Sequence, residues 1–557
     1  MSTSPLSTPA AEGSSPSNTE LKRNLGIVGL LFASVGSIIG SGWLFGALNA
    51  AATTGPSAIL SWIVGGVMVS FIGLVFAELG SMFPIAGGVV RFPHLAFGSF
   101  ASYTAGWSTW VAASTTAPIE VEGALQYATR YADFTEAHKG GTVHTLTPLG
   151  FVVAIVLMAV FVVINYIGIS WFARINNVLV SWKLVMIVLV ILAFLFTSFH
   201  GSNLHSEGFF THGAQGVFSA VATSGIVFSF LGFRQAIELA GEGAKPKRDI
   251  PMAVLGSILV TGILYVGLQI AFLVALDPGK LAQNGWDNVG NVLTNSAGPL
   301  ASVASAIGLG WLAVLLYIDA IISPGDTGLI YTTTTARMSY AMGRNGNAPR
   351  ALTRTTLSGA PWVSLVVAFI VGIIAFLPFP SWQQLVGFIT SATVLSFGPG
   401  PLAVGALRRR IPEHERPFRV PGGDLIPILG FASSNLIIYW TGWNTDWKLF
   451  VAILLGYALF AIHELISAET PPLELPSGAV WVIPWLAGLA IMSYVGDFDG
   501  GQGWVGFWTS IIILVAFSVV IYYLGVRNAL SREQIERHIA EAEEESVEEA
   551  AALGGTH

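Results

Sequence analysis

The stretch GSIIGSGW, residues 36–43, decides how this sequence folds. It lies inside the apolar segment 25–50, which is long enough to cross a bilayer because a membrane helix takes ~20 residues. Glycine and serine weaken a helix, and hydrocarbon offers no partner to freed backbone groups, so a membrane helix unwinds only where protein or a ligand lines the gap. The stretch therefore predicts a gap of this kind, or else a close contact between helices, for which small residues also serve.

The composition is that of an integral membrane protein. Of the 557 residues, 53% are hydrophobic and only 10% are charged, and there is no cysteine for a disulfide or a thiolate metal site. Residues 1–24 are rich in Ser, Thr and Pro and are expected to form a disordered cytoplasmic tail. Residues 528–557 are expected to form an acidic cytoplasmic tail, read as a solvated helix.

Hydropathy and the polar breaks predict fourteen membrane helices in an all-α fold. Three basic clusters orient them by the positive-inside rule: KPKR (245–248), the loop 337–354 and RRRIPEHERPFR (408–419). We expect a multi-pass protein of the plasma membrane with both termini cytoplasmic. The predicted spans are 25–50, 57–80, 96–127, 148–168, 174–197, 215–240, 251–276, 300–338, 361–379, 382–406, 425–443, 447–466, 478–495 and 503–525.

The sixth span repeats the weakness of the first. It contains SGIVFSFLGF (224–233), followed at once by Arg234. Interrupted helices at matching positions of two five-helix halves are typical of inverted-repeat transporters, whose site lies near the midplane of the bilayer. The halves would be 25–200 and 215–406, with 425–525 as four added helices.

Charged residues inside the predicted spans are candidates for function, because each needs a partner or a watery cavity. Lys183 lies in the fifth span and Arg234 just after the sixth break. A guanidinium at that place could pair with a substrate carboxylate, or with the protein's own Asp319 or Glu238.

Carboxylates offer routes for a proton. Asp319 is interpreted as a proton relay or as the partner of Lys183 or Arg234, whereas a structural cap is the favoured reading of Asp326. Glu120 and Glu122 are two residues apart and face different directions on a helix, and Glu120 is preferred as the inward one.

Other site classes find no support in the sequence. The ten His show no paired spacing, so no metal site is expected, and no Walker loop, HExxH or nucleophile elbow occurs. We expect neither an enzyme nor a cofactor, and no nucleic-acid partner.

Ser41 and Gly42 would offer backbone N–H groups to an anion, with Trp43 beside the gap.

Several motifs resemble the amino acid, polyamine and organocation transporter superfamily: GSIIGSGW (36–43), AELGSMFPIAGGVVRFP (77–93), GFRQAIELAGEGAKPKRDIP (232–251) and TARMSYAMGRNG (335–346). A second set resembles its bacterial aspartate:proton symporter branch: PIEVEGALQYA (118–128), LGWLAVLLYIDAIISPGDTG (309–328), LPFPSW (377–382) and YWTGW (439–443). The resemblance implies a ten-helix core of two inverted repeats, to which the last four helices are an addition.

The resemblance also implies roles for residues at the two breaks. Backbone amides of the first break would bind the substrate carboxylate, and carbonyls of the sixth would bind its ammonium group, while Phe233 closes over the ligand. Lys183 would stand where related sodium-coupled carriers hold sodium. The expected substrate-binding residues are Ile39, Gly40, Ser41, Gly42, Trp43, Phe230, Leu231, Gly232, Phe233 and Arg234; those for proton coupling are Lys183, Asp319 and Glu120.

The sequence thus predicts a secondary transporter that takes up aspartate or glutamate with a proton by alternating access. The expected partners are an amino acid, protons and the lipid bilayer, and the oligomeric state is left open. Alternatives are an exchanger, a permease for neutral amino acids or polyamines, and, from another class, a membrane receptor that senses an amino acid.

Overall fold

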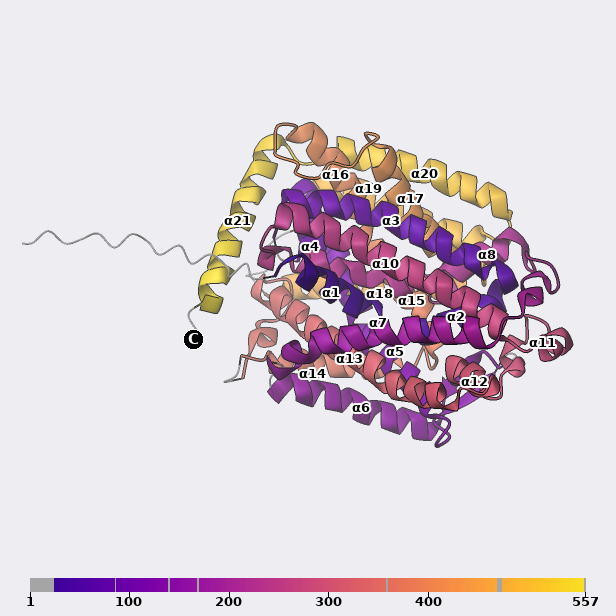
Figure 1. Cartoon of the computed structure of the whole chain (residues 1–557). Helices are drawn as coiled ribbons and strands as arrows, with labels where there is room; N and C mark the ends of the chain where they lie inside the picture. Colours follow the sequence, from indigo (N-terminus) through magenta and orange to yellow (C-terminus); the bar gives the residue numbers. More distant parts are fainter. Residues whose placement is uncertain are drawn as a thin grey trace, which may run out of the picture.

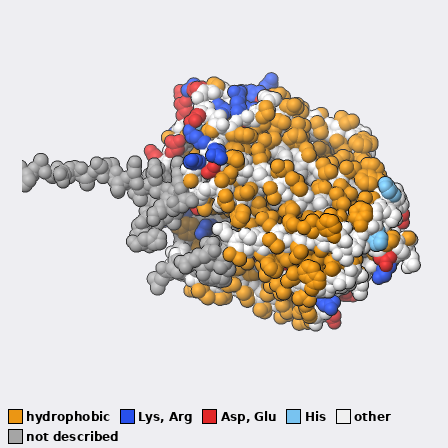
Figure 2. Space-filling model, in the orientation of Figure 1, with side chains coloured by type: hydrophobic (Ala, Val, Ile, Leu, Met, Phe, Trp, Pro, Cys, Tyr) orange, Lys and Arg blue, Asp and Glu red, His pale blue; other side chains and the backbone are white. Residues whose placement is uncertain are grey.

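The computed structural model describes residues 25–85, 87–138, 141–167, 170–356, 359–467 and 473–554, and describes side chains within these ranges except at 170–176 and 546–554. The predicted tail 1–24 lies outside the described residues. Long helices run side by side along one direction (Figure 1). Apolar side chains cover most of the middle of the visible face, and Lys and Arg gather at the end where α16 and α21 lie (Figure 2).

The first half of the chain opens with a broken span, made of α1 (Ile27–Ile38) and α2 (Gly42–Thr54). A two-stranded antiparallel hairpin, β1 (Thr135–His138) and β2 (Val143–Leu146), joins α5 to α6. The remaining elements are η1 (Gly55–Ser57), α3 (Ala58–Met82), α4 (Gly88–Phe97), α5 (Ser99–Ala128), α6 (Pro148–Ile167), α7 (Ser170–Thr197) and η2 (Gly201–His205).

The second half repeats this plan. Its first span is again broken, into α8 (Gly213–Thr223), the 3₁₀ helix η3 (Phe228–Arg234) and α9 (Gln235–Glu238). There follow η4 (Ala240–Glu242), α10 (Pro246–Ala275), α11 (Pro278–Asn284), η5 (Val289–Val292), α12 (Pro299–Ala306), α13 (Gly310–Arg344), η6 (Arg350–Thr353), α14 (Trp362–Ala375), α15 (Trp382–Phe397) and α16 (Pro399–Arg410). The chain ends with α17 (Leu425–Thr441), α18 (Trp443–Ile466), α19 (Leu475–Val495), α20 (Phe507–Arg527) and α21 (Arg532–Gly554).

Membrane-spanning helices are confirmed by length and composition. Within the described residues, nine helices are long and apolar enough to cross a bilayer, or ten when the bent pair of the sixth span counts as one. α5 is not among them, because Ser, Thr and Glu lower its hydropathy, but it is 30 residues long and almost wholly buried. The count of fourteen spans and the side of each terminus stay predictions.

Two details of the predicted helices were wrong. The span 300–338 is two helices, α12 and α13, because Gly308 has a φ of +85° that ends the first one. The acidic tail is not solvated throughout: Ile535 is fully buried, and Leu530 N–H donates to Ala96 O at 3.0 Å, because α21 lies against α4.

Candidate functional site

The break in the first span exposes the start of α2. Ser41 N–H donates a 2.7 Å hydrogen bond to Glu120 Oε2 of α5, and Ser41 Oγ accepts one of 2.7 Å from Trp382 Nε1. The first turn of a helix attracts anions, because its N–H groups have no partner within the helix. Glu120 therefore occupies the anion position that the sequence analysis assigned to the substrate carboxylate.

Glycine at this break allows close approach. A Cβ atom at Gly40 would lie 2.5 Å from Glu120 Oε1, and a Cβ atom at Gly42 would collide with Ser229 Oγ of η3. Larger residues at these positions would push Glu120 and η3 away from the start of α2.

The break in the sixth span meets the first one. The axis of α8 and that of the helical segment Phe228–Glu238 differ in direction by 47°. Gly225, with a φ of +87°, allows the chain to turn between them. Gly232 of η3 lies directly on the backbone of Ser37 and Ile38, where α1 ends. The two interruptions, far apart in sequence, are thus one joint feature of the fold.

A small cavity lies where the two breaks meet. Helices α5, α13 and α15 close its sides, and Glu120 and Arg234 both line it. The full lining is Ser37, Ile38, Gly40, Thr116, Glu120, Phe228, Leu231, Gly232, Arg234, Thr327, Tyr331, Ile389 and Thr393.

The 3₁₀ geometry of η3 selects which of its side chains face the cavity. A 3₁₀ helix has three residues per turn, so side chains at i and i+3 share a face. Phe228, Leu231 and Arg234 follow that spacing, and all three line the cavity.

The other face of η3 packs into the protein. The Phe233 ring packs against Phe397 at 5.2 Å between centroids, and the Phe230 ring lies 6.0 Å from that of Trp62. Phe228 is the aromatic residue of η3 that lines the cavity, and the closing of the Phe233 ring over a bound ligand stays a prediction.

Arg234 is a buried cation with spare donors. Its side chain is 1% exposed, and its Cζ lies 5.2 Å from the centre of the Tyr331 ring. Glu238 Oε1 is 3.5 Å from Nε, whereas Asp319 is not its partner. Among the described residues, Nε and Nη1 find no hydrogen-bond partner. Buried donors of this kind are costly unless a ligand satisfies them.

Lys183 joins three helices. Its Nζ lies 2.5 Å from Asp326 Oδ2 on α13 and 3.1 Å from Gly36 O on α1, and Thr327 Oγ1 is 3.5 Å away. Both charged side chains are fully buried. The ion pair therefore ties α7 to the end of α1 beside the break.

Asp326, and not Asp319, is the partner of Lys183. Asp319 accepts hydrogen bonds from Trp182 Nε1 at 2.8 Å and from Ser323 Oγ at 2.9 Å, and is not the partner of Lys183. The reading of Asp326 as a structural cap was wrong, because α13 continues through it to Arg344 and leaves no helix end to cap.

The remaining expected residues lie close to the cavity without lining it. Ile39 O is 3.5 Å from Thr327 Oγ1, and Trp43 is fully buried in α2. Glu122 does not line the cavity, and neither of its carboxylate oxygens has a hydrogen-bond partner among the described residues. Asp326 was expected to be structural, and Tyr331 and Trp382 were not among the expected site residues, although Trp382 ends the motif LPFPSW (377–382).

Two broken membrane helices that meet at a buried cavity are the arrangement expected of a carrier. The family model for amino acid permeases matches residues 25–517, and the chain belongs to this family. It is therefore a multi-pass amino acid transporter and not an enzyme.

Three relatives span nearly the same length. The glutamate/serine transporter AimA of Bacillus subtilis is 35% identical over 93% of this chain and 96% of its own. The aspartate-proton symporter of the same organism is 34% identical over 92% and 98%. The branched-chain amino acid permease BcaP, also of B. subtilis, is 26% identical over 80% and 93%.

Proposed function

We propose that this permease takes up an acidic amino acid, aspartate or glutamate, together with a proton. The observation that carries the proposal is Arg234, a buried guanidinium whose Nε and Nη1 have no hydrogen-bond partner among the described residues although it lines the cavity. A planar guanidinium can bind a carboxylate through two parallel hydrogen bonds. Nη1 and Nη2 form one such parallel pair, so the side-chain carboxylate of the substrate would bind at that edge and satisfy Nη1, while Nε faces Glu238.

Glu120 supplies a way to link substrate and proton. Its carboxylate holds Ser41 N–H, the group that would receive the substrate's α-carboxylate. Protonation of Glu120 removes the charge that strengthens this bond, so Ser41 becomes available to the incoming anion. Substrate and proton then favour each other's binding, which is the requirement for symport.

The Lys183–Asp326 pair is the second element of coupling. Lys183 Nζ also donates a hydrogen bond to Gly36 O near the end of α1. A change in the protonation of the pair would therefore alter the contact that holds α1 beside the first break. The two B. subtilis relatives named for glutamate and aspartate support the acidic substrate, and the second also supports the proton. We place the permease in the plasma membrane with both termini cytoplasmic, on the strength of its basic loops.

Uptake into proteoliposomes of the purified chain tests the substrate. With an inwardly directed proton gradient, we expect accumulation of aspartate and glutamate and little of lysine. Arg234→Ala should lower acidic uptake roughly 100-fold, because it removes two charge-assisted hydrogen bonds of about 1.5 kcal/mol each. Serine uptake should change far less, since serine has no second carboxylate.

Ile389→Val is the matched control, because Ile389 lines the same cavity without a charge. It should keep the preference for acidic substrates. Equal losses for aspartate and serine in Arg234→Ala would remove Arg234 from the recognition of the side chain. A neutral substrate would then be the better proposal.

A further inference from the structure

The C-terminal helix α21 belongs to the packed body of the transporter at the end that carries the basic loops. It lies across that end of the molecule, beside α4 (Figure 1). Ile535 is fully buried, and Arg91 of α4 forms a 3.2 Å ion pair with Glu545 of α21. The position of α21 is thus defined by specific contacts with α4.

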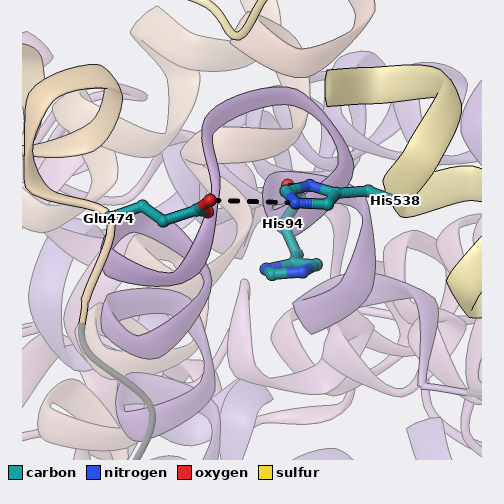
Figure 3. A group of neighbouring side chains, drawn as sticks. All are labelled: His94, Glu474 and His538. Carbon is teal, nitrogen blue, oxygen red and sulfur yellow. Dashed lines mark hydrogen bonds and ion pairs between the residues drawn. The ribbon is translucent and has the colours of Figure 1, made fainter. Parts of the chain in front are cut away.

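Three side chains from separate segments meet where α21 crosses α4: His94 of α4, Glu474 just before α19, and His538 of α21 (Figure 3). One nitrogen or carboxylate oxygen from each lies within 4.8 Å of the others. The two imidazole rings are stacked, with centroids 4.5 Å apart and planes 15° from parallel. His538 is 5% exposed, so the group lies at the edge of the protein interior.

The hydrogen bonds of His538 prepare it to bind a metal ion. Its Nδ1 lies 3.3 Å from the backbone oxygen of His94, so Nδ1 carries the proton and donates it there. Nε2, the remaining ring nitrogen, lies 3.8 Å from Glu474 Oε1. A backbone carbonyl that fixes one imidazole nitrogen while the other faces an acidic ligand is the usual surrounding of a metal-binding histidine.

We propose that His94, Glu474 and His538 bind a divalent zinc ion that fastens α21 to α4. Two imidazole nitrogens and one carboxylate oxygen form a common protein ligand set for zinc, with water in the fourth position. Ligand atoms around tetrahedral zinc are ~3.3 Å apart for bonds of ~2.0 Å, so the atoms now within 4.8 Å of one another must draw together, and the two stacked rings must tilt until both ring planes meet at the ion. Thiolate competition does not arise, since the chain has no cysteine.

A backbone hydrogen bond fixes the acidic ligand of the group. Glu474 Oε2 accepts a 3.2 Å hydrogen bond from Ser99 N–H, which orients its carboxylate. The ion would act on transport through α4, because Gly87 N–H, directly before α4, donates to Glu238 O at the end of α9.

Metal binding to the purified full-length protein tests the site. Zn²⁺ titrated calorimetrically should bind in one saturable step per chain, and Co²⁺ should give the visible absorption of a tetrahedral nitrogen and oxygen site. His94→Ala and His538→Ala should each abolish the step, and Glu474→Gln should weaken it at least tenfold. His463→Ala is the matched control and should bind as the unaltered chain does, since His463 lies in the last turn of α18, outside the group.

Tail docking gives an independent readout. Zn²⁺ should slow tryptic cleavage after Arg537 of α21 at least fivefold in the unaltered chain and in His463→Ala, but not in His94→Ala. His94→Ala and His538→Gln proteins that elute as folded monodisperse species yet keep the zinc step would overturn the proposal. So would an unaltered chain that shows no saturable Zn²⁺ binding at micromolar concentration. Neither result depends on which amino acid the carrier transports.

Discussion

Lys183 and Asp326 show how the protein tolerates charge in its interior. Both side chains are fully buried and 2.5 Å apart, and Lys183 has a backbone carbonyl as a second acceptor. Removing one member of such a pair leaves an uncompensated charge and costs about 3–5 kcal/mol, whereas replacing both with apolar groups of similar volume is often neutral. The pair therefore marks a functional requirement more than a gain in stability.

A mutant cycle on this pair separates stability from coupling. Lys183→Met and Asp326→Leu should each lower the free energy of unfolding by about 3–5 kcal/mol, and the double variant should recover most of the loss. Thermal unfolding in detergent micelles measures this. The double variant should nonetheless fail to accumulate substrate on a proton gradient. If the loss of unfolding free energy in the double variant equals the sum of the losses in the two single variants, the two charges do not compensate each other.

Glu120 offers a sharper test of the proton. Glu120→Gln keeps an oxygen that can accept from Ser41 N–H but cannot titrate. We expect uptake at equal pH on both sides to persist within about tenfold, which is about 1.4 kcal/mol, while stimulation by a pH gradient disappears. Glu122→Gln serves as control, because Glu122 does not line the cavity. Undiminished gradient stimulation in Glu120→Gln would exclude Glu120 as the coupling group.

At the scale of elements, the two broken spans could be predicted and their detailed faces could not. GSIIGSGW and SGIVFSFLGF indicate weak helices from composition alone. Which side chains reach the cavity depends on the period of three in η3, and glycine content does not specify that period. The sequence also left open whether Asp319 or Asp326 pairs with Lys183, since the two carboxylates lie seven residues apart on one face of α13. The packing of α7 against α13 decides it: Trp182 contacts Asp319, and Lys183 contacts Asp326.

Gly232 is the contact through which the two breaks depend on each other. Gly232→Ala would place a methyl group on the backbone of Ser37 and Ile38, which cannot yield as a side chain can. We expect uptake to fall at least 100-fold, roughly 3 kcal/mol, with lower thermal stability. Gly66→Ala on α3 is the control, because its nearest neighbour is a Phe230 ring atom at 3.5 Å. Similar uptake in the two variants would show that this contact is dispensable.

The β1–β2 hairpin is expected to respond to acid. Burial lowers the pKa of His144 to about 4, and its Nε2 lies 3.1 Å from Ser296 Oγ in the loop before α12. Unfolded histidine takes up a proton near pH 6.5, so the hairpin should keep its stability above that pH and lose it as the pH falls towards 4. Hydrogen exchange of residues 143–146 at pH 7.5 and 4.5 measures this. His144→Gln should show no such loss, and an equal loss in both proteins would exclude His144 as the cause.

At the scale of the whole molecule, the apolar spans carried most of the information in the sequence. Their length confirms a multi-pass membrane protein, and the basic loops gather at one end (Figure 2). The docking of α21 could not be predicted, because its acidic composition is equally typical of a solvated helix. The His94, Glu474 and His538 group could not be predicted either, since its members come from three separate segments and have no local spacing.

The bond between Ser41 and Glu120 has a consequence for the direction of transport. When no substrate is bound, the Glu120 carboxylate accepts from Ser41 N–H at the start of α2. The empty carrier can therefore return to the side where it loads substrate without binding a second amino acid from the other compartment. Net, one-way accumulation should therefore be its normal mode, rather than obligatory counterflow. Vesicles preloaded with unlabelled aspartate and vesicles left empty should take up labelled aspartate at initial rates within about twofold, about 0.4 kcal/mol. Uptake that requires preloading would mean that the empty protein cannot make the return step.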